Sequence, residues 1–188
     1  MKKKGVNILA ILAIVVVLVI VGLVVFLTRR PSAEPNSNGG RGGETWELTV
    51  LCLVHRGDEL LLQNRRKSDW SGYAPPGGHV EPGESIVNAV IREMQEETGL
   101  TVQNPRLCGI KQFPIEGGRY LVFLFETEQF TGQLRSSSEG EMRWIPRKDL
   151  PNYRTVDDLE PLLDVMLSDC LTEFQYLVNG EDWIVKIL

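Results

Sequence analysis

The sequence predicts a mixed α/β domain, with helices packed on a β-sheet, behind a hydrophobic N-terminal segment. Three observations support this prediction: β-rich runs bounded by turn residues, an amphipathic helix with cap residues at both ends, and a long apolar run near the N-terminus. The length of 188 residues suits one globular domain plus a smaller segment.

The apolar run covers residues 5–27, follows the basic residues 1–4, and is interrupted only by Asn7. About 20 such residues cross a bilayer as a helix, so we expect a single transmembrane anchor. A cleavable signal peptide is the alternative, but its apolar core is about 7 to 15 residues long and ends in small residues. This run is longer and ends in VVFLTRR. Basic residues flank both ends, so its orientation stays open.

A linker is predicted for residues 28–43, which are rich in Pro, Ser, Asn and Gly. The domain proper then covers residues 44–188. It holds 14 Lys and Arg against 24 Asp and Glu, so the chain's net charge of −5 conceals a domain near −10. An acidic domain is a poor ligand for a nucleic-acid backbone, and we expect no nucleic-acid polymer as a partner.

The three cysteines, Cys52, Cys108 and Cys170, are widely separated and lie in apolar surroundings. They are typical of buried reduced thiols rather than of a disulfide framework or a zinc site. The two histidines, His55 and His79, have no metal-ligand or triad spacing, so we expect surface or loop positions for them.

The first half of the domain predicts a hairpin, because β-rich runs at 45–55 and 59–66 are joined by Arg56-Gly57-Asp58. Residues 68–78 form a loop or short strand that ends in two prolines and two glycines.

A helix follows over 85–98, with Ser85 as N-cap and Gly99 at the C-terminal position that favours glycine. An apolar stripe for packing on the sheet is expected from Val87, Ile91, Met94 and Thr98.

The second half predicts strands at 101–113, 119–130 and 140–146, of which the second is apolar enough to be central. A second helix covers 155–170, with Pro161 near enough to its start to be tolerated. The chain ends in a hairpin whose Asn179-Gly180 pair is typical of a type I′ turn.

Three glutamates, Glu93, Glu96 and Glu97, lie on one patch of the first helix, beside Arg92. An isolated charge run of this kind is usually a solvated face. Here a glycine-rich loop precedes it, and Mg²⁺ is bound in proteins by a few carboxylates together with substrate phosphates. The combination indicates a site for metal-assisted phosphate chemistry.

The spacing of these residues resembles the Nudix box, with Gly78, five residues, Glu84, seven residues, and then Arg92-Glu93-Met94-Gln95-Glu96-Glu97-Thr98-Gly99-Leu100. A chance match at every fixed position is on the order of 10⁻⁷ for such a chain. The resemblance covers roughly 44–188 and implies the Nudix fold, an α/β/α sandwich with a mixed sheet and a loop-helix-loop box.

The resemblance implies hydrolysis of a nucleoside diphosphate linked to another moiety, with Mg²⁺ or Mn²⁺ as cofactor. By this likeness Glu93, Glu96 and Glu97 hold the metal together with the Gly77 carbonyl. Glu93 or a neighbouring glutamate deprotonates the attacking water, and Arg92 orients a glutamate. Glu84 is either an additional metal ligand or a residue that shapes the box, Gly99 also shapes the box, and Gly78 lets the polyphosphate approach the backbone.

Further candidates lie outside the box. Members of this family often recruit one more acid before a Trp-containing strand, which implies Glu139, with Glu141 as the alternate, upstream of Trp144. Related enzymes also place a phosphate-binding arginine at the end of the second strand, which implies Arg65 or Arg66.

The substrate is less constrained than the reaction. The runs LLLQNRRKSDWSGYAPPGGHVEPGES and EFQYLVNGEDW resemble those of MutT-type enzymes that hydrolyse 8-oxo-dGTP. Asn152 is a candidate base reader because its amide both donates and accepts. Pro75 departs from the large apolar residue usual there, and it has no N–H for a base contact. Dinucleoside polyphosphates and nucleotide sugars stay open as substrates.

Two non-enzymatic readings also remain: a membrane-tethered module that senses a nucleotide, and a structural partner protein. A sanitising enzyme needs the cytosolic nucleotide pool, so we expect the domain on the cytosolic face of the membrane, although the flanking charges narrowly favour a cytosolic N-terminus. The oligomeric state stays open.

Overall fold

The computed structural model describes residues 43–66 and 70–188. The predicted basic N-terminus (1–4), transmembrane helix (5–27) and linker up to residue 42 therefore lie outside the described residues. Among the helices that are described, none is both long and apolar enough to cross a membrane.

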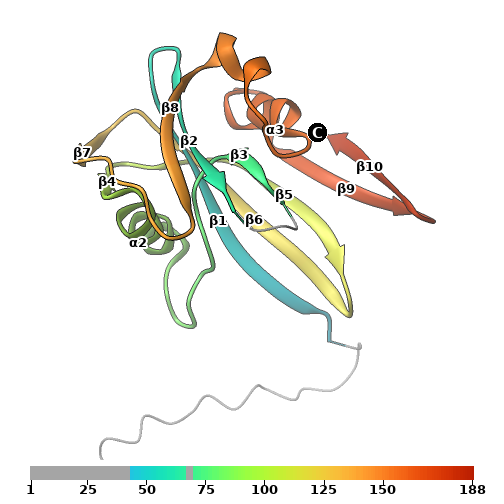
Figure 1. The fold of residues 1–188 in the computed structure, drawn as a ribbon. Helices are drawn as coiled ribbons and strands as arrows, with labels where there is room; N and C mark the ends of the chain where they lie inside the picture. The colour runs from blue at the N-terminus through green and yellow to red at the C-terminus, as the bar shows by residue number, and fades with distance from the viewer. Residues whose placement is uncertain (1–42, 67–69) are drawn as a thin grey trace, which may run out of the picture. The chain divides into compact units, whose positions relative to one another are not determined.

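A mixed sheet forms the centre of the described domain, with strand order β10-β9-β5-β6-β1-β2-β3 and β8 paired to β2 (Figure 1). The parallel neighbours are β1 with β6 and β5 with β9, and the other neighbours are antiparallel. The strands are β1 (Thr45–Arg56), β2 (Glu59–Arg65), β3 (Gly72–Ala74), β5 (Arg106–Ile115), β6 (Gly118–Thr127), β8 (Gly140–Pro146), β9 (Glu173–Asn179) and β10 (Asp182–Ile187).

The prediction of a central strand is confirmed, because β6 lies between β1 and β5. Two of the predicted strands are each divided into two strands in the structure. The run 101–113 divides into β4 (Leu100–Val102) and β5, with Asn104 between them at a φ of 46° that no strand residue adopts. The run 119–130 likewise divides into β6 and β7 (Phe130–Gly132), and β4 and β7 pair with each other as a small separate sheet.

Helix α2 (Ile86–Thr98) is bounded as predicted. The Ser85 hydroxyl accepts a hydrogen bond of 3.1 Å from the Asn88 amide, and Gly99 has a left-handed φ of 74°. The predicted apolar stripe was partly wrong, because Val87 is 47% exposed whereas Val90 is fully buried. The sheet-facing side of α2 is therefore centred closer to Val90 and Met94.

The second helix, α3 (Leu159–Met166), is shorter than predicted. It begins after Asp158, whose φ of 58° is non-helical, so Pro161 falls in the first turn, where proline is tolerated. A 3₁₀ helix, η1 (Arg147–Asn152), was not predicted.

The two helices cover opposite faces of the sheet (Figure 1), as the alternation along β1 shows. Leu51 and Leu53 join the core beneath α3, whereas Val50 and Cys52 join the core beneath α2. This arrangement is the α/β/α sandwich that the resemblance implied.

The terminal hairpin is confirmed, but its turn is displaced by one residue. Asn179 pairs with Asp182, so the loop is Gly180-Glu181, and Gly180 carries the positive φ of 66°. A glycine with positive φ at the first loop position is the pattern of a type II′ turn rather than the predicted type I′.

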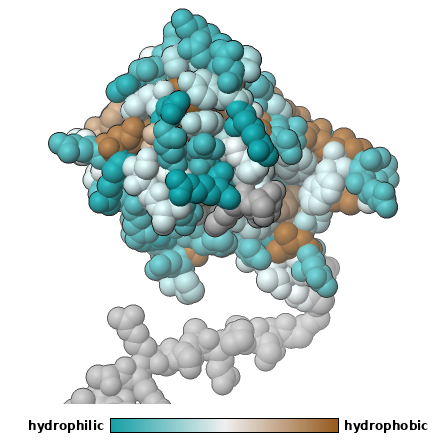
Figure 2. All heavy atoms as spheres, viewed as in Figure 1, coloured by the Kyte–Doolittle hydropathy of each residue, from teal (hydrophilic) through white to brown (hydrophobic). Residues whose placement is uncertain are grey.

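In Figure 2 the visible face is mostly hydrophilic, with apolar surface on the side where β9 and β10 lie.

The cysteines are all free thiols, as expected. Cys52 and Cys108 are buried, and burial raises the pKa of the Cys108 thiol to about 11. Cys170 is exposed, which corrects the expectation that all three are buried, because it follows α3 in a surface turn.

Candidate active site

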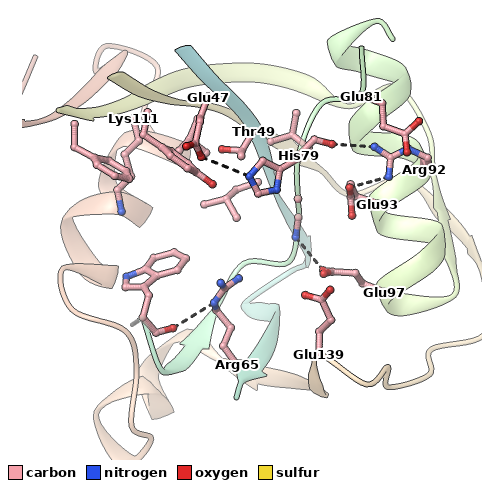
Figure 3. Close-up of a pocket in the computed structure, with 18 of the residues that line it drawn as sticks. Glu47, Thr49, Arg65, His79, Glu81, Arg92, Glu93, Glu97, Lys111 and Glu139 are labelled. Carbon is pink, nitrogen blue, oxygen red and sulfur yellow. Dashed lines mark hydrogen bonds and ion pairs between the residues drawn. The ribbon is translucent and has the colours of Figure 1, made fainter. Parts of the chain in front are cut away.

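A cavity of about 690 Å³ opens between the C-terminal half of α2, the loop that precedes α2, and the sheet. Its lining includes the box residues Gly77, Gly78, Arg92, Glu93 and Glu97. Figure 3 shows Glu93, Glu97 and Glu139 together beside α2, Lys111 on the opposite side, and Arg65 between them in this view.

The glycine loop is held against β1 by backbone hydrogen bonds. The amides of Val50 and Cys52 donate to the carbonyls of Gly78 and Pro76, both over 2.9 Å. A Cβ on Gly77 would collide with the Val50 carbonyl, and a Cβ on Gly78 would lie 2.5 Å from the Glu93 carboxylate. Packing on β1 therefore requires glycine at position 77, whereas a side chain at position 78 would displace the Glu93 carboxylate.

Arg92 connects the loop to the helix. Its Nε and Nη2 atoms donate to the two carboxylate oxygens of Glu84 over 3.0 and 2.9 Å, a forked pair that fixes the loop geometry. Nη2 also donates to the His79 carbonyl, while Nη1 donates to Glu93 over 2.7 Å and to Glu96 over 3.3 Å. The hydrogen bond from Arg92 lowers the pKa of Glu84, so that carboxylate is held ionised.

Glu97 is the most buried of the box carboxylates, at 5% exposure. Burial is the main cause that raises its pKa, to about 7, against the lowering effect of a hydrogen bond from the Gly77 amide. The carboxylates of Glu139 and Glu93 raise the pKa further. Mutually repelling carboxylates around a cavity form a site whose charge a cation would neutralise.

The donor set fits Mg²⁺ or Mn²⁺, which prefer carboxylate oxygens. Within the described residues, however, no three acidic, histidine or cysteine side chains form a ready-made ligand cluster. Arg92 engages Glu93 and Glu96 instead. Glu96 is also 62% exposed and does not line the cavity. The predicted ligand set therefore stays a prediction.

The structure separates the candidates outside the box. Glu139 lines the cavity next to Glu97, whereas Glu141 pairs with Arg143 over 2.8 Å at the surface. Arg65 lines the cavity and donates to the Trp70 carbonyl over 3.3 Å.

Two predicted substrate contacts are not brought to the cavity. Arg66 is exposed at the end of β2, and Asn152 is exposed in η1. Neither side chain lines the cavity. Pro75 is buried beneath the loop that leads into the glycines.

An aromatic and basic end of the cavity was missed by sequence reasoning. Phe113 and Tyr120 stack there with ring centroids 4.8 Å apart, and Lys111 is buried at 5% exposure. The only signal for Lys111 was a charge inside an otherwise β-rich run, CGIKQF. Together with Tyr176 and Trp183, these rings come from four separate strands, so the sequence alone did not group them.

A family model described as the NUDIX domain matches residues 45–166. Among curated proteins, an uncharacterized Nudix hydrolase YvcI from Bacillus subtilis is 34% identical over 123 residues, which are 62% of this chain and 77% of that protein. The human 8-oxo-dGDP phosphatase NUDT18 is 29% identical over 72% of this chain and 43% of its own length. The NAD-capped RNA hydrolase NudC from Haemophilus influenzae is 30% identical over 66% of this chain and 49% of its own length.

Solved structures of other proteins are also similar to this chain. The mutator MutT protein from Bacillus halodurans has a TM-score of 0.62 and 30% identity, over 75% of this chain and 97% of that one. The ORF135 protein from E. coli has a TM-score of 0.58 and 25% identity, over 69% of this chain and 94% of its own. The present chain spans less than half the length of the NUDT18 and NudC relatives.

Proposed function

The chain belongs to the NUDIX family and is a Nudix hydrolase, and from this premise we propose that it cleaves a nucleoside triphosphate to the monophosphate and pyrophosphate with Mg²⁺ or Mn²⁺. The observation that carries the proposal is one cavity with Glu93, Glu97 and Glu139 on one side and Lys111 with aromatic rings on the other. Such a cavity suits a ligand that joins a metal-bound polyphosphate to a flat base.

The proposed ligand set for the metal is Glu93, Glu96 and Glu97, with the Gly77 carbonyl and with Glu139, which lies next to Glu97. A bound divalent ion lowers the pKa of its water and neutralises charge on the phosphate oxygens. Arg92 engages one carboxylate oxygen of Glu93 and one of Glu96, so the second oxygen of each would hold the ion.

The side chains of this chain perform the remaining tasks. Glu93 accepts a proton from the attacking water while the water oxygen bonds to the α-phosphorus. The bond between that phosphorus and the oxygen that bridges to the β-phosphate breaks, which releases pyrophosphate. Arg92 keeps the loop and Glu84 in place, Gly78 leaves room for the polyphosphate, and Arg65 binds a phosphate oxygen with its forked donors.

The favoured substrate is an oxidised purine nucleoside triphosphate such as 8-oxo-dGTP. The MutT-like structure and the relative named 8-oxo-dGDP phosphatase support this choice. The relative named NAD-capped RNA hydrolase favours a second candidate, in which the substrate is another nucleoside diphosphate-linked compound such as a dinucleoside polyphosphate or a nucleotide sugar.

For location, we propose a single-pass membrane protein, anchored by residues 5–27, with its catalytic domain on the cytosolic face where nucleotides are available. The length and apolar character of that run support the anchor. Protease added to intact cells should leave the domain uncut and should degrade it only after the membrane is opened. Cleavage in intact cells would place the domain outside.

The substitution Glu93→Gln in the full chain tests the proposed chemistry. It removes the proton acceptor at nearly constant shape, so kcat should fall by about 10²-fold or more while nucleotide binding is retained. Glu160→Gln on the exposed side of α3 is the matched control and should keep full activity. An unchanged turnover in Glu93→Gln would contradict the proposal, and a wild-type chain that binds nucleotide without hydrolysis would indicate a sensing module.

A further inference from the structure

Lys111 occupies a position in β5 that the fold would normally fill with an apolar side chain. Its neighbours across the sheet are Val122 in β6 and Phe174 in β9, and both are buried. Lys111 itself is only 5% exposed. Burial disfavours the charged ammonium and lowers its pKa to about 8. An apolar residue would stabilise this core better, so the lysine calls for an explanation beyond packing.

Aromatic rings surround the Lys111 ammonium. Its Nζ lies 4.6 Å from the ring centroid of Trp70 and 5.2 Å from those of Phe174 and Tyr176. Within residues 43–66 and 70–188, no carboxylate lies within ion-pair distance of it, and no hydrogen bond from it is found. Ring faces attract a cation but cannot accept three N–H bonds, so the donors have capacity for a ligand.

The ammonium lines the cavity on the side away from Glu93, Glu97 and Glu139 (Figure 3). The rings of Phe113 and Tyr120 stack beside it, and Trp183 contacts Phe113 edge-on with centroids 6.4 Å apart. A flat heterocycle gains binding free energy from stacking on such surfaces. The polyphosphate belongs at the opposite end, where the proposed metal ligands lie. Lys111 is therefore placed to meet the base.

We propose that Lys111 is a specificity-determining residue whose ammonium donates a hydrogen bond to the carbonyl oxygen at position 6 of a purine base. This inference rests on the proposed function and adds the base class that the site selects. Guanine presents an acceptor at O6, and the oxidised base 8-oxoguanine keeps it. Adenine presents an amino group at the same position.

The selectivity for 6-oxo over 6-amino purines follows from the hydrogen-bond donors of the Lys111 ammonium. An ammonium has three donors and no acceptor, so the amino group of adenine would face another donor and leave both without a partner. A site built to pair with a polar group rejects an analogue that lacks it, because its own buried group then stays unpaired. We expect a preference of about 10-fold or more for 6-oxo over 6-amino purines.

Binding of nucleoside monophosphates to the full chain without metal provides the test. The probes are dGMP, dAMP and the 2-aminopurine deoxynucleotide, which lacks the oxygen at position 6. Wild type should bind dGMP about 10-fold more tightly than either of the others. Lys111→Met keeps the apolar stem and removes the donors, so it should reduce dGMP affinity to that of 2-aminopurine and leave the 2-aminopurine affinity unchanged. Lys186→Met, an exposed lysine outside the cavity, is the matched control.

Two results would overturn the inference. Equal affinities for the three probes in wild type would show that position 6 is not read. An equal loss for all probes and for inorganic pyrophosphate in Lys111→Met would make Lys111 a phosphate ligand instead.

The inference and the proposed function fail separately. Selective dGMP binding that depends on Lys111, in a chain that hydrolyses no triphosphate, would preserve the inference and refute the function. Hydrolysis of dGTP and dATP with equal kcat/KM, in wild type and in Lys111→Met, would preserve the proposed function and refute the inference.

Discussion

The backbone amide of Gly77 donates a hydrogen bond of 3.0 Å to Oε2 of Glu97, on the inner face of α2. This bond joins the glycine loop to the helix, and it is one of few interactions that favour the charged form of a carboxylate buried among like charges. The loop and the acidic helix face therefore form one unit.

Gly78→Ala should reduce turnover sharply with little loss of stability. The added methyl group would lie 2.5 Å from the Glu93 carboxylate, so that side chain must move out of its position. A displacement of this size near reacting groups costs about 10²-fold in kcat/KM. Gly43→Ala is the control, because a Cβ there meets nothing within 4 Å. Steady-state kinetics and thermal melting measure the two effects, and normal kcat/KM in Gly78→Ala would contradict the account of this glycine.

Arg92→Lys should lower activity although it conserves charge. The guanidinium donates to both oxygens of Glu84 and also to Glu93, a set that a single ammonium cannot reproduce. We expect kcat/KM to fall by about 10-fold or more and the free energy of unfolding to fall by about 1 to 2 kcal/mol.

The control for this change is Arg119→Lys, whose surface ion pair with Glu44 should contribute less than about 1 kcal/mol. Chemical denaturation of the full chain provides the stability values. Equal effects of the two substitutions would mean that the Arg92 fork has no special role.

Glu139→Gln and Glu141→Gln form a matched pair two residues apart. Only Glu139 lines the cavity, where its charge acts on Glu97, whereas Glu141 pairs with Arg143. Glu139→Gln should raise the Mg²⁺ concentration needed for half-maximal activity by about 10-fold, and Glu141→Gln should not change it. A metal titration of initial rates distinguishes them, and the opposite ranking would move the extra acid to Glu141.

Lys111 makes the protein's stability depend on pH in the alkaline range. Folding lowers the pKa of Lys111 from 10.5 to about 8, and burial is the largest cause. Between pH 8 and pH 10.5, therefore, Lys111 is protonated in the unfolded chain and deprotonated in the folded chain. The free energy of unfolding therefore gains a contribution that rises with pH across that window, on the order of 1 to 3 kcal/mol.

Lys111→Met should remove this contribution and flatten the pH profile. Urea denaturation at intervals between pH 7.5 and 10 measures it, with Lys186→Met as the control that should keep the wild-type slope. If the slopes of wild type and Lys111→Met are the same, the ammonium is solvated rather than buried.

Local signals made much of the fold predictable from the sequence. Ser85 and Gly99 bounded α2 because capping depends on residues within one turn of the helix end. The break at Asn104 was missed because a left-handed residue without glycine leaves little trace in composition. Val87 was misassigned to the buried stripe because the buried side of α2 is centred on Val90 and Met94, and tertiary packing decides which apolar side faces the sheet.

Part of the candidate site could also be predicted from local sequence signals, and part could not. The box residues could be predicted because one loop and one helix hold them at fixed spacing. The basic and aromatic end could not, because Lys111, Phe113 and Tyr120 meet Tyr176 and Trp183 only when β5, β6, β9 and β10 assemble. The exposure of Asn152 and Arg66 had the same cause, since polarity alone does not show which way a side chain faces.

The most direct test of the central claim is the product analysis of 8-oxo-dGTP incubated with the full chain, with Mg²⁺ and with a chelator. The account predicts equal amounts of 8-oxo-dGMP and pyrophosphate with Mg²⁺, about 10²-fold less turnover with the chelator, and faster hydrolysis than for dGTP. Preference for dGTP would contradict the sanitising role, and no pyrophosphate release from either nucleotide would contradict the proposed reaction itself.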